Sequence, residues 1–167
     1  EFQRGYIAMI IGAKFATKRL PMEKIKEICQ NAQYPILLIG GKEDTDLGKL
    51  IEDHVQKKSI KNIAGKYNLL QSASIIQQAT CIITNDTGMM HIASAFNKKI
   101  ISIWGNTTPE IGFAPYRVTE SVIVENKSIS CRPCSKIGFN ACPKGHFNCM
   151  NQLDMGEVVK ELPILSN

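Results

Sequence analysis

The sequence lacks several features that would point to common functional classes. It has no apolar run of the ~18–20 residues that a membrane-spanning helix needs. No Gly-x-Gly-x-x-Gly fingerprint follows the first apolar run, which argues against a dinucleotide-dependent dehydrogenase. The chain has one Trp, and its lysines are scattered without interleaved aromatic residues, so we expect no nucleic-acid partner. It also shows no signal peptide, internal repeat or low-complexity segment.

Size and composition are those of a single globular domain. The chain has 167 residues, of which 44% are hydrophobic and 21% are charged, so one domain with a substantial core is expected. The net charge of +5 has two interpretations, a lysine-rich solvated surface or attraction of an anionic ligand. Because the chain opens with Glu1 rather than Met, we expect a fragment of a longer protein.

Strand-like and helix-like segments alternate along the chain. Near-continuous apolar runs predict strands at 6–11, 35–39, 60–63, 81–84, 99–105 and 121–124. Helical spacing of apolar residues predicts helices at 21–33, 44–57, 69–79, about 87–96 and 154–162. Strands that are apolar throughout are typical of a parallel sheet covered on both faces. The predicted fold class is therefore α/β, a Rossmann-like parallel sheet with helices on both faces.

The turn after the fourth predicted strand is the strongest candidate for a ligand site. It holds Asp86, Thr87, Gly88, Met89 and His91 at the carboxyl edge of the sheet, where open α/β folds bind ligands. A helix that begins near Thr87 points its free N–H groups at this edge, which suits a phosphate. The alternative is structural: Asp86 or Thr87 caps the helix and His91 packs one turn later.

Two further loops carry charged candidates. Lys18 lies between the first strand and the helix that Pro21 opens, so it is either a solvated loop lysine or a cation placed to meet an anionic ligand. Thr17 is a candidate hydroxyl donor, and Arg19 is a secondary candidate cation. Glu43 follows the second strand, so it is either a ribose ligand or a carboxylate favoured by a helix N-terminus.

The six cysteines fall into two groups. Cys29 and Cys81 lie in apolar patterns and are predicted to be small core residues. The other four lie in a Gly-, Pro- and Lys-rich loop at 127–152, namely Cys131, Cys134, Cys142 and Cys149. They could bind a structural zinc ion, form two disulfides or remain free, and a cytoplasmic location disfavours disulfides. The first pair has the spacing of zinc ligands, whereas the second pair is more widely spaced than usual.

Four segments resemble, in order, the nucleotide-sugar half of glycosyltransferase family 9, the lipopolysaccharide heptosyltransferases and their relatives. They are Gly12-Ala13-x-x-x-x-Lys18-Arg19-Leu20-Pro21, Gly40-Gly41-Lys42-Glu43, Asp86-Thr87-Gly88-x-x-His91 and Ile103-Trp104-Gly105-Asn106-Thr107-Thr108-Pro109. The cysteine-rich tail is similar to tails of many members. Leu20 departs from the pattern, since the family usually has Trp there.

The resemblance implies the C-terminal, donor-binding domain of a GT-B glycosyltransferase across residues 1–167, with a Cys-rich loop at 127–152 and a closing helix at 154–162. The N-terminal acceptor domain, which supplies the catalytic base in this family, is absent, so no catalytic residue is expected here. The full enzyme is expected to move a sugar, a heptose in the best-known members, from an ADP-heptose-like donor to a lipopolysaccharide-type glycolipid. No cofactor is expected at the diphosphate. The expected location is cytoplasmic, at the inner face of the inner membrane, with peripheral membrane contact.

The resemblance also assigns a donor-binding set. Lys18 matches the family's phosphate-binding lysine, Glu43 its ribose ligand, and Tyr67 lies in the loop that contacts adenine mainly through its backbone. The complete predicted set is Thr17, Lys18, Glu43, Tyr67, Asp86, Thr87, Gly88, Met89 and His91. Two other classes stay open at this point, a non-catalytic nucleotide-binding module and a metal-stapled interaction module.

Overall fold

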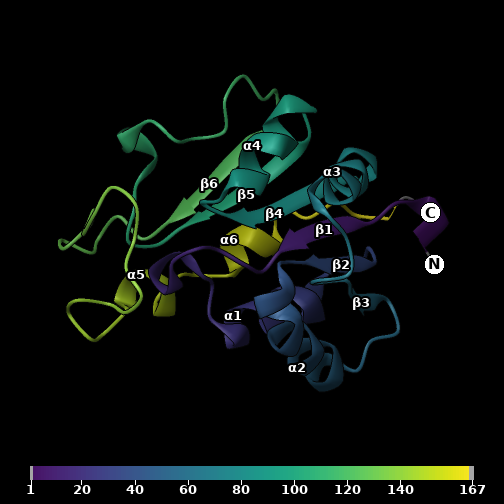
Figure 1. The fold of residues 1–167 in the computed structure, drawn as a ribbon, viewed down its shortest axis with the longest axis horizontal. Coiled ribbons are helices and arrows are strands. Elements are labelled where there is room, and N and C mark those ends of the chain that lie inside the picture. Colours follow the sequence, from purple (N-terminus) through teal and green to yellow (C-terminus); the bar gives the residue numbers. More distant parts are fainter. Residues whose placement is uncertain (1, 166–167) are drawn as a thin grey trace.

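The computed structural model describes residues 2–165 and contains a six-stranded sheet within them (Figure 1). The strands are β1 (Ile7–Ile10), β2 (Ile36–Ile39), β3 (Ile60–Asn62), β4 (Cys81–Asn85), β5 (Lys99–Trp104) and β6 (Ser121–Glu125). Their order is β3-β2-β1-β4-β5-β6, and every neighbouring pair is parallel. This is the doubly wound order, in which the chain reverses direction across the sheet between β1 and β4. The predicted fold class is confirmed.

Helices cover both faces of the sheet (Figure 1). They are α1 (Met22–Asn31), α2 (Thr45–Val55), α3 (Leu69–Gln78), α4 (Gly88–Ala95) and the short α5 (Asn148–Asn151) and α6 (Gly156–Val159). α1 contacts α2 and α6 on one side of the sheet, and α3 contacts α4 on the other.

The core consists of two apolar layers, one on each side of the sheet. Successive side chains of a strand point to opposite faces, so Ile7 and Met9 enter the layer under α1 and α2. Ala8 and Ile10 enter the layer under α3 and α4. Because both faces of the central strands are buried, β1 and β2 are apolar at every position, which explains their unbroken apolar runs.

The closing helix is shorter than the predicted 154–162. Only Gly156–Val159 is α-helical, and Asp154 Oδ1 accepts a hydrogen bond from the Gly156 N–H at 2.8 Å. After this turn the backbone tightens, since the N–H of Leu162 bonds to the carbonyl of Val159 three residues back. The other predicted helices and strands are present, with ends displaced by a few residues. No helix within residues 2–165 combines the length and apolar character required to cross a bilayer.

Candidate functional site

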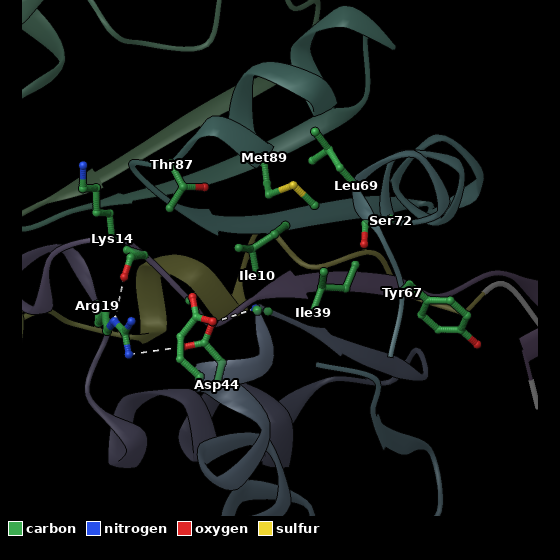
Figure 2. Close-up of a pocket in the computed structure, with 15 residues that line it drawn as sticks. Ile10, Lys14, Arg19, Ile39, Asp44, Tyr67, Leu69, Ser72, Thr87 and Met89 are labelled. Carbon is green, nitrogen blue, oxygen red and sulfur yellow. Dashed lines mark hydrogen bonds and ion pairs between the residues drawn. The ribbon is translucent and has the colours of Figure 1, made fainter. Parts of the chain in front are cut away.

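A cleft of about 540 Å³ opens at the carboxyl edge of the sheet, over the point where the chain reverses between β1 and β4 (Figure 2). Its floor includes Ile10 at the end of β1 and Ile39 at the end of β2. The loops that follow β1, β2, β3 and β4 form its walls. Ligands bind at this position in doubly wound folds.

The two ends of the cleft differ in chemistry (Figure 2). Lys14 and Arg19 stand at one end, on the loop after β1. Tyr67, Leu69 and Ser72 stand at the other end, on the loop after β3 and the start of α3. A basic end suits an anionic group, and an apolar end with a partly exposed aromatic ring suits a flat organic ring.

The wall formed by the start of α4 offers unused hydrogen-bond donors. Thr87 lines the cleft, and its Oγ1 is buried without a hydrogen-bond partner among residues 2–165. Thr87 is the N-cap residue of α4, and no side chain caps this end of the helix. The first N–H groups of a helix lack intrahelical acceptors, so those of Gly88 and Met89 remain available to an anion. A Cβ built on Gly88 would meet no protein atom within 4 Å, so this position is open.

Lys18 and Asp86 form a buried ion pair next to this wall. Lys18 Nζ lies 2.6 Å from Asp86 Oδ2, and the two side chains are only 14% and 6% exposed. The Thr107 hydroxyl donates to the same carboxylate oxygen at 2.9 Å. Asn85 holds the two loops together, because its Oδ1 accepts the Leu20 N–H at 3.2 Å. The sequence placed Lys18 at a phosphate but gave no indication of its pairing with Asp86 or of the contact from Thr107.

The structure adds a second ion pair, between Arg19 and Asp44. Arg19 Nη1 lies 3.2 Å from Asp44 Oδ1, and both residues line the cleft (Figure 2). The sequence indicated Arg19 only as a secondary cation and Asp44 only as the start of a helix. The available signal for Asp44 was its position three residues after the Gly40-Gly41 turn.

The nine predicted donor-binding residues are divided by the structure. Glu43, Tyr67, Thr87 and Met89 line the cleft. Lys18, Asp86 and Gly88 do not line it but are the chain neighbours of Arg19, Thr87 and Met89, which do.

Thr17 and His91 lie in other surroundings. The Thr17 hydroxyl donates to the Phe139 carbonyl at 3.1 Å and accepts the Phe139 N–H at 2.8 Å, so it is a structural link rather than a free donor. His91 is exposed and lines a separate hollow with Tyr116 and Arg117, because the α4 helix turns it away from the cleft. The prediction that these two side chains join the donor site is therefore not supported by their positions.

All six cysteines are free thiols. Cys29 and Cys81 are core residues as predicted, and burial raises the pKa of each thiol to about 12. Within residues 2–165 no three His, Cys, Asp or Glu side chains are arranged to hold a metal ion. The arrangement of Cys131, Cys134 and the other loop cysteines therefore favours neither the zinc nor the disulfide interpretation; sequence spacing alone does not fix where the sulfur atoms lie.

Cys142 differs from the other thiols in its surroundings. The small burial of its side chain raises the pKa of the thiol, but hydrogen bonds from the backbone N–H groups of residues 144–147 lower it more. The net pKa lies below the usual value. Cys142 therefore forms the thiolate more readily than Cys134 and Cys149, whose pKa values burial raises.

The loop that carries these cysteines is tied to the site by Arg132. This guanidinium pairs with Glu125 at 2.9 Å, donates to the Gly105 carbonyl and donates to the Thr107 carbonyl at 2.9 Å. Arg132 therefore holds the segment whose Thr107 hydroxyl contacts Asp86.

A protein-family model and curated relatives place this chain in the same family. The model described as glycosyltransferase family 9 (heptosyltransferase) matches residues 1–142. The chain is 33% identical over 115 residues to lipooligosaccharide heptosyltransferase 2 of Haemophilus influenzae, a match that covers 65% of this chain and 33% of that protein. It is 30% identical over 115 residues to lipopolysaccharide heptosyltransferase 2 of Escherichia coli K12, with the same coverage.

Solved structures give the same answer for the fold. The E. coli ADP-heptose lipopolysaccharide heptosyltransferase II structure superposes with a TM-score of 0.69 at 24% identity, covering 95% of this chain and 49% of that one. The structure of E. coli heptosyltransferase WaaC with ADP superposes with a TM-score of 0.64 at 17% identity, covering 74% of this chain and 39% of that one. The chain thus spans about a third to a half of the length of these relatives.

Proposed function

Because the chain belongs to glycosyltransferase family 9, we propose that it is the donor-binding part of a heptosyltransferase-like enzyme. The cleft binds a nucleoside diphosphate sugar, of which ADP-heptose is the proposed example. The observation that carries this proposal is the uncapped start of α4 at the wall of a cleft with a basic end; Thr87 lines this wall, and its buried hydroxyl has no hydrogen-bond partner among residues 2–165. Two related E. coli proteins are named for ADP-heptose or were solved with ADP, which supports the choice of nucleotide.

We propose that the diphosphate lies between the start of α4 and the basic end of the cleft. The N–H groups of Gly88 and Met89 and the Thr87 hydroxyl donate to its oxygens. The nucleoside extends toward Tyr67, and Glu43 accepts hydrogen bonds from the ribose hydroxyls. Both residues line the same cleft, and the exposed Glu43 carboxylate is free to turn toward a sugar.

Transfer requires the acceptor to displace the diphosphate from the anomeric carbon, so negative charge develops on the leaving phosphate. Fixed cations and helix N–H groups that face this charge stabilise the transition state without reorganisation. Lys18 supplies such a cation, and its ion pair with Asp86 fixes its ammonium group near the start of α4. We propose that these groups make a metal ion unnecessary at the diphosphate.

The remaining parts of the proposal concern the full-length enzyme. The acceptor is a lipopolysaccharide-type glycolipid, held with the catalytic base by a second domain. The enzyme works at the cytoplasmic face of the inner membrane through peripheral contact. The present chain alone binds donor and catalyses no transfer.

The test uses Gly88→Val, since a Cβ at this position has open space around it and a valine side chain there enters the space proposed for the diphosphate. Ala95→Val is the matched control, because Ala95 is exposed at the far end of the same helix. Isothermal titration with ADP should show binding by the parent chain and by Ala95→Val, and none by Gly88→Val. A folded Gly88→Val variant that binds ADP like the parent chain would place the donor site elsewhere.

A further inference from the structure

The Asp44 carboxylate is buried and fixed at the junction of two loops. Asp44 is 1% exposed, and its Oδ2 accepts the Gly41 N–H at 2.9 Å. A Cβ built on Gly40 would come within 2.8 Å of Asp44 Oδ2, and one built on Gly12 would overlap the same oxygen. The carboxylate therefore occupies space that the two glycines leave after β1 and β2, and it has little room to move.

Arg19 is held by two anchors that leave part of its guanidinium group free. Its Nε donates to the Ala13 carbonyl at 2.8 Å, and its Nη1 forms the ion pair with Asp44 Oδ1 (Figure 2). The hydrogen bond from Nε and the ion pair at Nη1 together restrict the position of the group. No atom of residues 2–165 accepts a hydrogen bond from Nη2, and the side chain is 31% exposed at the wall of the cleft.

Asp44 itself retains an unused acceptor. The contact from Arg19 Nη1 to Asp44 Oδ1 lacks hydrogen-bond alignment, so this buried oxygen has no hydrogen-bond donor among the described residues. A buried carboxylate oxygen without a donor is costly. A diphosphate has only acceptor oxygens, so it cannot satisfy Asp44 Oδ1; what suits a phosphate here is the set of unused N–H donors on Arg19, which the pairing with Asp44 holds at the wall of the cleft.

Lys18 differs from Arg19 in its exposure and in its position relative to the cleft. Its ammonium lies against Asp86, its side chain is 14% exposed, and it does not line the cleft. A guanidinium presents five N–H donors in a planar fork, so Arg19 can keep both anchors and still bind a phosphate.

We infer that Arg19 is a principal diphosphate-binding residue of the cleft and that Asp44 is the residue that positions it. This inference rests on the proposed function and refines it, because it assigns the ground-state diphosphate contact to Arg19. Lys18 then has the separate role of stabilising the negative charge that develops on the leaving phosphate during transfer. The free edge of the Arg19 guanidinium donates to the diphosphate while Nε and Nη1 keep their protein partners.

The experiment compares ADP with adenosine, which lacks phosphates, by titration monitored with NMR on the 167-residue chain. Arg19→Gln should weaken ADP binding about ten-fold or more, the usual effect of losing a charge-assisted hydrogen bond, and should leave adenosine affinity unchanged. Arg19→Lys keeps the charge but cannot hold both anchors, so it should lose most of the same affinity. Arg117→Gln, an exposed arginine in the separate hollow, is the matched control and should bind ADP like the parent chain.

The positioning role of Asp44 is tested by combining variants. Asp44→Asn should weaken ADP binding in the parent chain, because it releases Arg19 from its position. In the Arg19→Gln background it should cause no further loss of ADP affinity. If the ion pair only supported the fold, Asp44→Asn would instead lower the affinities for ADP and for adenosine together.

If the parent chain binds ADP and the folded Arg19→Gln and Arg19→Lys variants bind it equally well, this inference is wrong while the proposed function stands. If the parent chain binds no ADP, the proposed function fails and the inference fails with it. The Arg19→Lys result decides the matter should Arg19→Gln fail to fold.

Discussion

Breaking the Lys18–Asp86 pair should destabilise the domain strongly. Asp86→Asn leaves the Lys18 ammonium, which is only 14% exposed, without a counter-charge. Removing one partner of a buried ion pair costs ~3–5 kcal/mol. Because Lys18 keeps some contact with water, we expect the lower end, about 3 kcal/mol. For a domain of this size that loss corresponds to a fall in Tm of roughly 6–12 °C.

The assay is a double-mutant cycle of Lys18→Met, Asp86→Asn and the double variant, measured by urea unfolding and calorimetry. Lys18→Met should also destabilise, because within the described part of the chain the Asp86 carboxylate then keeps a single donor, the Thr107 hydroxyl. The double variant should be less destabilised than the sum of the single variants by about 2 kcal/mol. Additivity within ~0.5 kcal/mol would refute the reasoning, since it would mean that the two charges do not interact.

An exposed pair provides the control for this cycle. Lys61 and Glu52 lie 3.8 Å apart, with side chains 54% and 33% exposed. The cycle of Lys61→Met and Glu52→Gln should give a coupling of no more than about 1 kcal/mol, the usual range for a surface ion pair.

Two further predictions concern the thiols and the glycine turns. The lowered pKa of Cys142 gives it a larger thiolate fraction near pH 7 than Cys29 or Cys81, whose pKa values are about 12, so Cys142 should react with iodoacetamide before them in the native state. Peptide mass mapping after brief labelling checks the order, and earlier labelling of Cys29 would contradict it. Gly12→Ala should lower the free energy of unfolding by about 1–3 kcal/mol, because its Cβ overlaps the fixed Asp44 carboxylate. Urea unfolding measures this loss, and a neutral result would show that Asp44 is free to move.

The sheet could be predicted from sequence because each strand carries its own signal. Residues 81–83 are apolar in succession, and this run indicates a strand buried on both faces without knowledge of the neighbouring strands. The predicted start of α3 at residue 69 has a local cause of the same kind, since the side chain of Asn68 caps it: Asn68 Oδ1 accepts the Gln71 N–H at 2.9 Å. Local signals fail at the end of the chain, where the closing helix at 154–162 reduces to Gly156–Val159.

The charged network of the site could not be predicted in this way. Arg19 meets Asp44, and Thr107 meets Asp86, across loops that follow different strands. Such pairs depend on which strands are neighbours in the sheet and on the path of each loop above its edge. A single sequence reveals neither. His91 shows the converse. It belongs to the same sequence motif as Thr87, which lines the cleft, but the direction of α4 places the His91 side chain in a separate hollow.

The location of the donor site is tested most directly by titrating the uniformly ¹⁵N-labelled chain with ADP and following backbone amide shifts. The account predicts that the largest changes fall on the loops that line the cleft, at Gly12, Gly41 and Tyr67, and on Thr87, Gly88 and Met89 at the start of α4. Saturable changes confined instead to the hollow beside Tyr116 and Arg117, or no change at millimolar ADP, would contradict it.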